Sequence, residues 1–408
     1  MSNSTKIIND PVYGLISINS SLCFELIQHR YFQRLRHITQ LGLTYVVYPG
    51  ATHSRFQHSI GAMFLMQKAI ETLQNKGVVI SRMEEEAVLA AILLHDIGHT
   101  AFSHALEYFF VPNCSHEDFS MLIIESLNRQ LGGRLDLTIA ILTDSYERHF
   151  FHQLVSSQLD VDRLDYLNRD SFYTGVAEGV IGSERIIQML NVHSNSLVAE
   201  SKAVYSIEKF IISRRLMYWQ VYLHKTVHVA EQMLISVLSR VRYLYSLGVE
   251  VFLTPSLSFF FSTQRQISDF ELCGNLEHYM DITDHSIWFC IQRWQEHEDK
   301  VLSELSRRLY QRNLFKIEVS EQAFEEAYLS QIAERVRNCL HISVADSQYF
   351  VFHGEMVNRA YNAKMESILI MDKQGLVRPL EDLSDHLNHR TLSETVSKYF
   401  LCYPKDIL

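Results

Sequence analysis

The spacing of apolar and polar residues along the chain predicts a mainly helical fold. Apolar residues recur at intervals of three and four, which is typical of helices that bury one face. The ranges with this pattern are 20–41, 56–74, 82–97, 116–130, 136–145, 149–157 and 160–170. Residues 208–246 predict a long helix or a pair of helices, and 255–345 is mainly helical with a weaker pattern.

Shorter stretches predict strands. Residues 6–18 carry a turn signal at Asn9-Asp10-Pro11 and alternate after Gly14, so we expect a hairpin. Extended structure is also expected at 45–48, in a hairpin over 191–207, and over 346–383 around a turn at 373–375. We place a soft boundary near residue 250, which divides the chain into a helical core (1–250) and a helical, β-containing C-terminal lobe (251–408).

Residues 92–106, ILLHDIGHTAFSHAL, carry the strongest chemical signal. An apolar run leads into His95-Asp96, and Gly98 is placed like a glycine that follows a helix end. We therefore expect His95 and Asp96 in the last turn of a buried helix. Burial of an imidazole beside a carboxylate is costly unless both are paired. A divalent metal satisfies both groups, and the alternative is a His–Asp hydrogen bond without metal.

Further polar residues favour the metal. The candidate ligands come from separate predicted helices and are His58, His95, Asp96 and Asp162. Two imidazoles and two carboxylates suit Fe, Mn, Zn, Ni or Co and do not select one of them. An ion with open coordination positions generates hydroxide near neutral pH and polarises a phosphoryl oxygen.

A second polar set follows the first along the chain. Its members are His99, His104, Glu107, His116 and Glu117. His104 and Glu107 are three residues apart, so the carboxylate could orient the imidazole as a general acid requires. An exposed surface pair is the alternative. Candidates for binding phosphate are Arg55, Arg163, Arg214 and Lys225. Each one taken alone is better explained as a solvated surface charge.

Composition narrows the class of protein. The chain has 408 residues, 47% of them hydrophobic, and a formal net charge of −10, which argues against a general nucleic-acid-binding surface. A basic pocket for a single nucleotide is still compatible with that charge. The six cysteines show no CxxC pair, the N-terminus lacks a signal peptide, and no apolar run is long enough to span a membrane. We expect a cytoplasmic protein with reduced cysteines.

A set of motifs in fixed order resembles the HD-domain deoxynucleoside triphosphate triphosphohydrolases, especially the branch with SAM and HD domains and its bacterial relatives. The motifs are NDPVYG (9–14), QRLRHITQLG (33–42), YPGATHSRFQHSIG (48–61), LLHDIGHTAFSHALE (93–107), HE (116–117), DVDRLDYLNRD (160–170) and YWQVYLHK (218–225). The C-terminal third matches only loosely, through YNAKMESILIMDKQG (361–375).

The resemblance implies a role for each matched position. It assigns His58, His95, Asp96 and Asp162 to one divalent transition metal per subunit. It places His99, His104, Glu107, His116 and Glu117 around the scissile phosphate, with His104 as the general acid. Phosphate contacts fall on Arg55, Arg163, Tyr166 and Arg214. The positions that hold deoxyribose and base are Gln40, Leu41, Asp170 and Tyr222.

The implied fold is an HD-domain helical bundle (1–250) with a small α+β C-terminal lobe (251–408), and the implied assembly is a homo-oligomer, a dimer or a tetramer. A magnesium ion on the substrate phosphates is also compatible. Lys6, Gln33 and Arg36 match an activator site of the family. Gln28 departs from it, because a neutral amide replaces the carboxylate that reads guanine. We expect no SAM domain before the HD core.

We expect metal-dependent hydrolysis of a deoxynucleoside triphosphate to deoxynucleoside and inorganic triphosphate. The alternatives are an HD phosphohydrolase that acts on a nucleoside monophosphate, a cyclic dinucleotide or guanosine tetraphosphate, and a nucleotide sensor with slow turnover.

Overall fold

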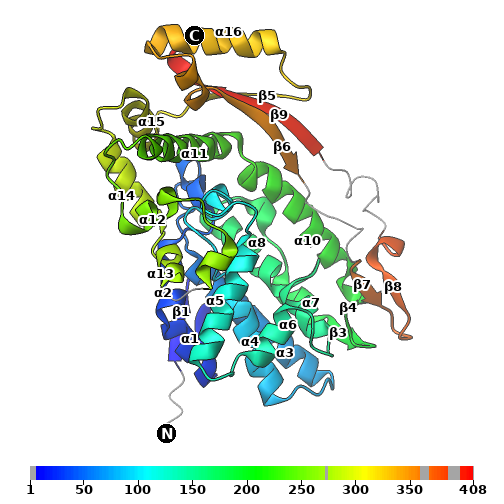
Figure 1. Ribbon diagram of the computed structural model, residues 1–408. Helices are drawn as coiled ribbons and strands as arrows, with labels where there is room; N and C mark the ends of the chain where they lie inside the picture. The colour runs from blue at the N-terminus through cyan, green and yellow to red at the C-terminus, as the bar shows by residue number, and fades with distance from the viewer. Residues whose placement is uncertain (1–5, 272–273, 359–366, 385–395, 408) are drawn as a thin grey trace.

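The computed structural model describes residues 6–271, 274–358, 367–384 and 396–407, and it is mainly helical (Figure 1). The α-helices are α1 (Ser21–Gln28), α2 (Arg30–Gln33), α3 (Arg55–Asn75), α4 (Arg82–Leu94), α5 (His116–Gln130), α6 (Asp136–Leu142), α7 (Phe150–Val155), α8 (Val161–Thr174), α9 (Ser183–Gln188), α10 (Val204–Met217), α11 (Lys225–Ser246), α12 (Pro255–Ser262), α13 (Asn275–Met280), α14 (Asp284–Trp294), α15 (Lys300–Tyr310) and α16 (Glu326–Leu340).

The strands form small sheets at the edges of the helical mass. They are β1 (Lys6–Asp10), β2 (Gly14–Ile18), β3 (Leu190–His193), β4 (Ser196–Glu200), β5 (Lys316–Ser320), β6 (Phe352–Asn358), β7 (Leu369–Met371), β8 (Val377–Pro379) and β9 (Val396–Tyr403). The sheet orders are β1-β2, β3-β4-β7-β8 and β5-β9-β6. All neighbouring strands are antiparallel except β4 and β7.

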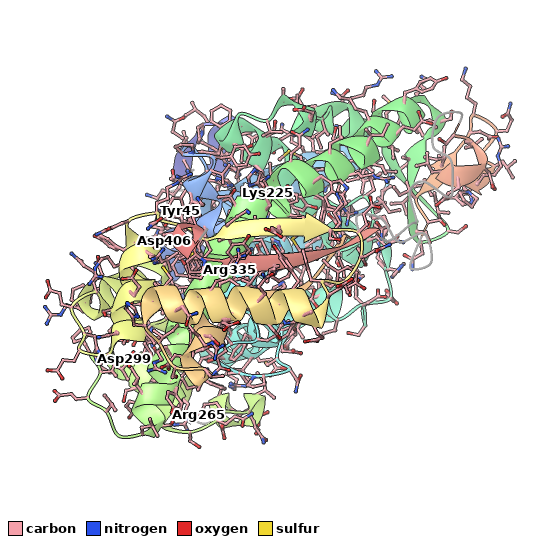
Figure 2. The ribbon with its side chains drawn as sticks, turned by 90° about the horizontal axis from the view of Figure 1, so that it is seen from above. Tyr45, Lys225, Arg265, Asp299, Arg335 and Asp406 are labelled. Carbon is pink, nitrogen blue, oxygen red and sulfur yellow. The ribbon has the colours of Figure 1, made fainter. Side chains whose placement is uncertain are left out.

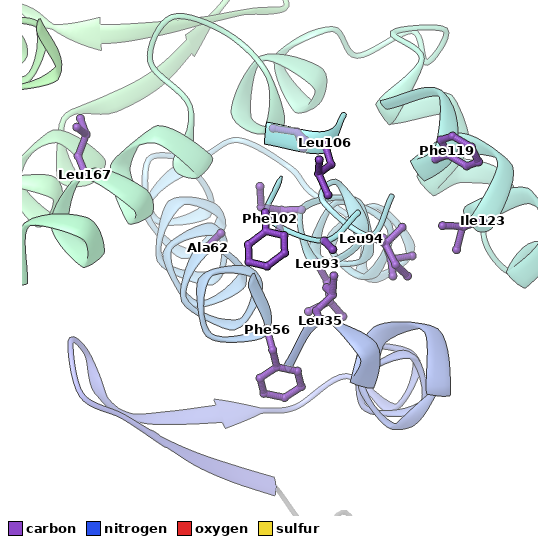
Figure 3. Close-up of a cluster of buried hydrophobic side chains, with 14 of the residues drawn as sticks. Leu35, Phe56, Ala62, Leu93, Leu94, Phe102, Leu106, Phe119, Ile123 and Leu167 are labelled. Carbon is purple, nitrogen blue, oxygen red and sulfur yellow. The ribbon is translucent and has the colours of Figure 1, made fainter. Parts of the chain in front are cut away.

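The core of the bundle lies where α3 packs on α4 and α8. Figure 3 shows side chains from these helices, from α5 and from two short 3-10 segments gathered in one cluster. Phe56 of α3, Leu93 of α4 and Leu167 of α8 are at most 3% exposed. Burial of apolar area at this scale is the main driving force for the fold, and it fixes the ends of these helices relative to one another.

The C-terminal residues cover one end of the bundle. In Figure 1 the β5-β9-β6 sheet and α16 lie at the end opposite the N-terminus, next to α11. Figure 2, seen from above, shows α16 lying alongside the strands of this sheet. Among the described residues, no helix combines the length and the hydrophobicity needed to cross a bilayer.

Residues beyond 250 also contact the central motif of the chain. The buried guanidinium of Arg34 donates to the carbonyls of His99 (2.8 Å) and Ile282 (3.1 Å). The Tyr279 hydroxyl donates to the carbonyl of Gly98 at 2.5 Å, and Asp284 accepts the N–H of Phe102 at 2.7 Å. The segment that contains α13 and α14 therefore supports the core directly. The boundary near 250 stays a prediction.

Most predicted elements are confirmed, including the hairpin at 6–18. The range 208–246 falls on two helices, α10 and α11. The single helix expected over 20–41 is wrong, because the chain is extended at His29, whose ring caps α2. The extended segment at 45–48 is also wrong: Gly42 has a φ of +51° and starts a 3-10 turn, Gly42–Val46. The hairpin expected over 191–207 ends at Glu200. Strands β5 and β9 were not predicted. Residues 361–366 of the C-terminal motif and Cys273 lie outside the described residues.

Candidate active site

The predicted metal ligands come from three helix ends that meet in the core. His58 lies in the first turn of α3, which starts where Gln57 Oε1 accepts the N–H of Ser54 at 2.8 Å. Asp162 lies in the first turn of α8, which is capped by Asp160. His95 and Asp96 follow α4 directly, so this helix ends slightly earlier than the sequence predicted. Because α3 packs on both α4 and α8, the three ends converge.

The distances in this group fit a metal ion. Asp162 Oδ1 lies 3.0 Å from His58 Nε2 and 3.4 Å from His95 Nε2, and the two Nε2 atoms are 3.4 Å apart. Ligand atoms that share one ion at bond lengths of about 2.0–2.2 Å are separated by roughly 3.0–3.5 Å. We call His58, His95 and Asp162 the ligand group.

The outer nitrogens of both imidazoles are held by acceptors. His58 Nδ1 is 2.8 Å from Asp165 Oδ2, and His95 Nδ1 donates to the carbonyl of Ile92 at 2.7 Å. With the proton on Nδ1, each neutral ring directs the lone pair of Nε2 towards the centre of the group, which is how metal-binding histidines are commonly held. Arg169, which is fully buried, orients Asp165 through bonds of 2.9 and 3.0 Å. The residues present therefore fit a divalent transition metal.

The electrostatics agree with a cation site. Burial lowers the pKa of His58, but hydrogen bonds to Asp162 and Asp165 outweigh burial and raise that pKa to about 10. Burial raises the pKa of Asp162, and the hydrogen bonds from His58 and His95 more than reverse this, so the pKa falls far below its ordinary value. The carboxylate thus favours positive charge at its imidazole neighbours, and a metal ion supplies that charge in place of protons.

Asp96 lies at the edge of the ligand group. Its Oδ1 is 3.4 Å from His95 Nε2 and its Oδ2 is 3.7 Å from His58 Nε2. The same carboxylate forms a buried ion pair with Arg55, which also donates to Ser103 Oγ at 2.9 Å. Burial raises the pKa of Asp96, while the charge of Arg55 brings it well below its ordinary value. Arg55, a predicted phosphate contact, is therefore also paired with a predicted ligand.

Three histidines form a second cluster beside the first, which we call the imidazole cluster: His99, His104 and His116. Glu107 links two of them, because one oxygen lies 3.2 Å from His104 Nδ1 and the other bonds His116 Nδ1. The hydrogen bonds from both rings overcome the effect of burial and hold the pKa of Glu107 far below its ordinary value. The exposed fraction of the His104 side chain is 68%, so its Nε2 edge is open to a substrate.

The segment that presents His104 has unusual backbone geometry. Phe102 and Ser103 have φ angles of +55° and +53°, which are rare for residues with a side chain. The N–H of Phe102 is held by Asp284, and Ser103 Oγ donates to the carbonyl of Thr39 at 2.8 Å. Backbone held in this region commonly marks a functional site. Here it fixes the direction of the His104 side chain.

Gly98 serves a different purpose from the one that the sequence suggested. Its φ is not positive, so it is not a left-handed helix cap. Instead α5 passes so close that a Cβ atom at this position would overlap the backbone of His116 and Ser120. Ser120 Oγ also bonds the His95 carbonyl (2.8 Å) and the Gly98 N–H (2.9 Å). Glycine allows the turn after His95-Asp96 to rest on the start of α5.

A cavity of about 600 Å³ opens over both groups. All predicted substrate-binding residues line it, namely Gln40, Leu41, Arg55, Arg163, Tyr166, Asp170, Arg214 and Tyr222. So do Asp96, Asp162, His99, His104 and His116. His58, His95 and Glu107 are not among its lining residues, so Asp162 is the member of the ligand group that reaches the cavity. Glu117 is exposed in the first turn of α5 and does not line the cavity. Lys225 is likewise exposed and absent from the lining.

One end of the cavity carries a fixed carboxylate. Asp170 is 1% exposed; its Oδ2 accepts the Tyr222 hydroxyl at 2.9 Å, and its Oδ1 lies 2.8 Å from His53 Nε2. Tyr222 ends a π-helical turn, Tyr218–Tyr222, between α10 and α11. A π turn shifts the register of a helix, often at functional sites, and here both of its end tyrosines line the cavity.

Sequence reasoning missed several residues that shape the site. Asp165 and Arg169 are four residues apart in DVDRLDYLNRD, a spacing that could have suggested their ion pair. Asp284 lies far along the chain and no local pattern connects it to Phe102. His228, Glu231 and Gln232 line the cavity from α11, and polar residues at i, i+3 and i+4 in an otherwise apolar helix were the available signal.

Comparisons with known proteins agree with this geometry. The HD domain matches residues 55–170, and the HD associated region matches 181–244. A crystallised phosphohydrolase from Bacteroides thetaiotaomicron is 48% identical, with a TM-score of 0.95 over 98% of this chain and all of that one. The uncharacterized protein YwfO of Bacillus subtilis is 36% identical over 76% of this chain and 71% of its own length.

A relative of named activity is more distant. The deoxynucleoside triphosphate triphosphohydrolase SAMHD1 homolog of Dictyostelium discoideum is 31% identical over 54% of this chain. The match spans 46% of that relative's length, so its activity as a whole protein is not transferred by similarity alone.

Proposed function

Because this chain belongs to the HD-domain family of metal-dependent phosphohydrolases, we propose that it hydrolyses deoxynucleoside triphosphates to deoxynucleoside and inorganic triphosphate. The observation that carries the proposal is the single cavity that joins the ligand group to guanidinium groups and to the Asp170–Tyr222 pair. Named relatives with this activity support it.

The residues that would hold the metal are His58, His95 and Asp162, with Asp96 beside them in its ion pair with Arg55. A divalent transition metal bound here supplies an acidified water and polarises a phosphoryl oxygen. Fe, Mn, Zn, Ni and Co all suit these donors, and a magnesium ion on the substrate phosphates is compatible with the cavity.

The cavity suits a polyphosphate better than a single phosphate. Arg55, Arg163 and Arg214 all line it, and a guanidinium group matches a pair of phosphate oxygens. Arg214 is 8% exposed, and its Nε has no hydrogen-bond partner among the described residues. A buried cation with an unused donor is a favourable contact for an anionic substrate.

The sugar lies at the Asp170 end of the cavity. A carboxylate that is already oriented by Tyr222 and His53 accepts a hydrogen bond from a ribose hydroxyl, here the 3′-hydroxyl. The aromatic ring of Tyr222 and the side chain of Leu41 would limit the space around C2′, and Gln40 also lines the cavity.

The leaving group is protonated by His104. Water attacks the α-phosphorus and releases a proton to solvent, the bond from phosphorus to O5′ breaks, and the proton of His104 passes to O5′ as the deoxynucleoside departs. Glu107, whose carboxylate lies 3.2 Å from His104 Nδ1, keeps this imidazole oriented for the transfer, which is the role of a carboxylate behind a general acid. His99 and His116 lie beside the same phosphate.

Product analysis tests the reaction. Protein reconstituted with Mn, Fe, Co, Ni or Zn is incubated with the four deoxynucleoside triphosphates, singly and mixed, and the products are separated by ion-exchange chromatography. The expected products are deoxynucleoside and inorganic triphosphate in equal amounts. Pyrophosphate or orthophosphate as the sole inorganic product would exclude the proposal. Parallel incubations with a monophosphate, a cyclic dinucleotide and guanosine tetraphosphate test the competing substrates.

Homo-oligomeric assembly, the cytoplasmic location and the altered activator site around Gln28 stay predictions. Size-exclusion chromatography with light scattering tests the first. A mixed-substrate incubation, which would reveal stimulation of one triphosphate by another, tests the last.

A further inference from the structure

One part of the cavity wall has no role in the reaction as described so far. It is a single face of α11, formed by His228, Glu231, Gln232 and Ile235, which follow one another at i, i+3, i+4 and i+7. Val227, which precedes this face, and the intervening residues Val229 and Ala230 are buried. α11 packs here against the 3-10 turns Gly42–Val46 and Ser103–Leu106, so its polar face is held against the cavity by the fold.

The polar atoms of this wall lack partners within the protein. Among the described residues, no hydrogen bond or ion pair reaches the Glu231 carboxyl, and burial alone raises its pKa to about 7. His228 Nε2 on the same face and Gln40 Oε1, elsewhere in the cavity lining, are buried without a hydrogen bond. The two buried atoms without a partner, His228 Nε2 and Gln40 Oε1, are costly for the empty protein. They indicate a ligand that supplies the missing hydrogen bonds.

The charge of Glu231 identifies which part of a nucleotide it faces. A carboxylate repels the triphosphate, for which the cavity already offers Arg55, Arg163 and Arg214. Asp170 already offers a carboxylate to the sugar. The base is the remaining part, and an ionised carboxyl only accepts hydrogen bonds. Guanine is the base that offers two adjacent donors, N1–H and the N2 amino group, to the two oxygens of one carboxylate; adenine, cytosine and thymine each offer one such donor group.

We propose that Glu231 determines the base specificity of this chain by accepting both edge donors of guanine, which makes dGTP the preferred substrate. This inference rests on the proposed function and names its substrate. Gln40 and His228, whose unpaired atoms lie in the same cavity, complete the polar surroundings of the base.

The test compares metal-loaded wild type with Glu231→Gln, using kcat and KM for dGTP, dATP, dCTP and TTP. Glutamine keeps the size of the side chain but loses the charge and one acceptor. The expected result is that kcat/KM for dGTP falls about 10- to 100-fold, mainly through KM, while the values for the other three change by less than about threefold. Glu334→Gln, on the exposed side of α16, is the matched control and leaves all four unchanged.

Two results would overturn the inference. An equal loss with all four substrates would show that Glu231 only supports the fold, and an unchanged ratio of dGTP to TTP would show that it does not read the base. Calorimetric binding of 2′-deoxyguanosine to wild type and to Glu231→Gln gives a readout without turnover, with weaker binding expected for the variant. Failure of the wild type to hydrolyse any of the four would refute the proposed reaction instead, so the two failures are distinguishable.

Discussion

Asp162 joins the two imidazoles of the ligand group, because its Oδ1 lies within 3.4 Å of both Nε2 atoms. We therefore expect Asp162→Ala to lose the metal as well as turnover. Elemental analysis after reconstitution checks this, with a metal content near zero expected against about one ion per wild-type subunit. A variant that retains a full complement of metal would show that the ion is held elsewhere.

His104 lies outside the ligand group but lines the same cavity. His104→Ala should keep the metal and lower kcat by about 10²–10⁴-fold, the usual effect of removing a general acid. The pair of variants separates binding of the ion from proton transfer. Steady-state kinetics on protein of verified metal content makes the comparison, and a rate near that of wild type would remove His104 from this role.

Glu231 should also influence stability, with a definite dependence on pH. Its folded pKa of about 7 lies above the ordinary value of 4.5, so the folded state holds more protons than the unfolded state between these values. The contribution of protonated Glu231 to the stability of the folded state is complete below pH 4.5 and is lost as the pH rises through about 7. The free energy of unfolding of Glu231→Gln should equal that of wild type at about pH 5. Above about pH 8 it should exceed the wild-type value by about 1–3 kcal/mol. Urea denaturation at both pH values measures this, and a constant difference would contradict it.

At the scale of elements, the turn that follows His95-Asp96 approaches the backbone of α5 closely at Gly98. Gly98→Ala would place a Cβ atom 2.8 Å from the carbonyl carbon of Phe119, among other close backbone atoms. We expect the free energy of unfolding to fall by about 1–3 kcal/mol or more, because the added atom overpacks this contact. We also expect reduced activity, because His116 and Asp96 would move apart. Thermal denaturation measures the first effect.

Gly182→Ala is the matched control for that substitution. A Cβ atom on Gly182 would have its nearest neighbour, Arg185 Cβ, at 3.9 Å, an ordinary contact. The φ of Gly182 is −85°, which any residue adopts. Equal melting temperatures for the two variants would show that the approach of α5 is not what requires glycine at residue 98.

The helices that carry the site could be predicted from the sequence, because their signals are local. Each of α3, α4, α5 and α8 combines an apolar period with a polar start. The site residues lie in the first turn of α3, α5 and α8 and directly after the end of α4. The π turn at Tyr218–Tyr222 could not be predicted, since its residues also suit an α-helix. Strands β5 and β9 depend on pairing with each other across about 80 residues, and a local pattern does not reveal the partner.

Local sequence patterns likewise do not reveal which residues of the site become partners in the fold. His58, His95, Asp96 and Asp162 were predicted as neighbours from residue type and family motifs, and they do lie together. The partner of Arg55 was not predicted, because the pairing with Asp96 follows from the meeting of α3 and the turn after α4. Glu231 was missed for a similar reason, since only the packing of α11 on the two 3-10 turns brings it to the cavity.

At the scale of the whole molecule, the segment beyond residue 250 takes part in shaping the site. Asp284 accepts hydrogen bonds from Thr39 N (2.9 Å), Thr39 Oγ1 (2.6 Å) and Phe102 N (2.7 Å). It thereby connects the start of α14 to the two segments that carry Gln40 and His104. A carboxylate at 5% exposure with several donors is a strong local restraint.

Asp284→Ala should therefore reduce catalysis although it removes no residue of the cavity. The N–H of Phe102 would lose its acceptor, at a cost of about 1–3 kcal/mol, and the left-handed backbone before His104 would relax. We expect kcat to fall about tenfold or more at unchanged metal content, with partial recovery in Asp284→Asn, which keeps one acceptor. Asp281 is an exposed neighbour, and Asp281→Ala should leave kcat and metal content unchanged. If Asp284→Ala instead lost stability alone, with normal kcat in the folded fraction, the C-terminal segment would support the core without positioning the general acid.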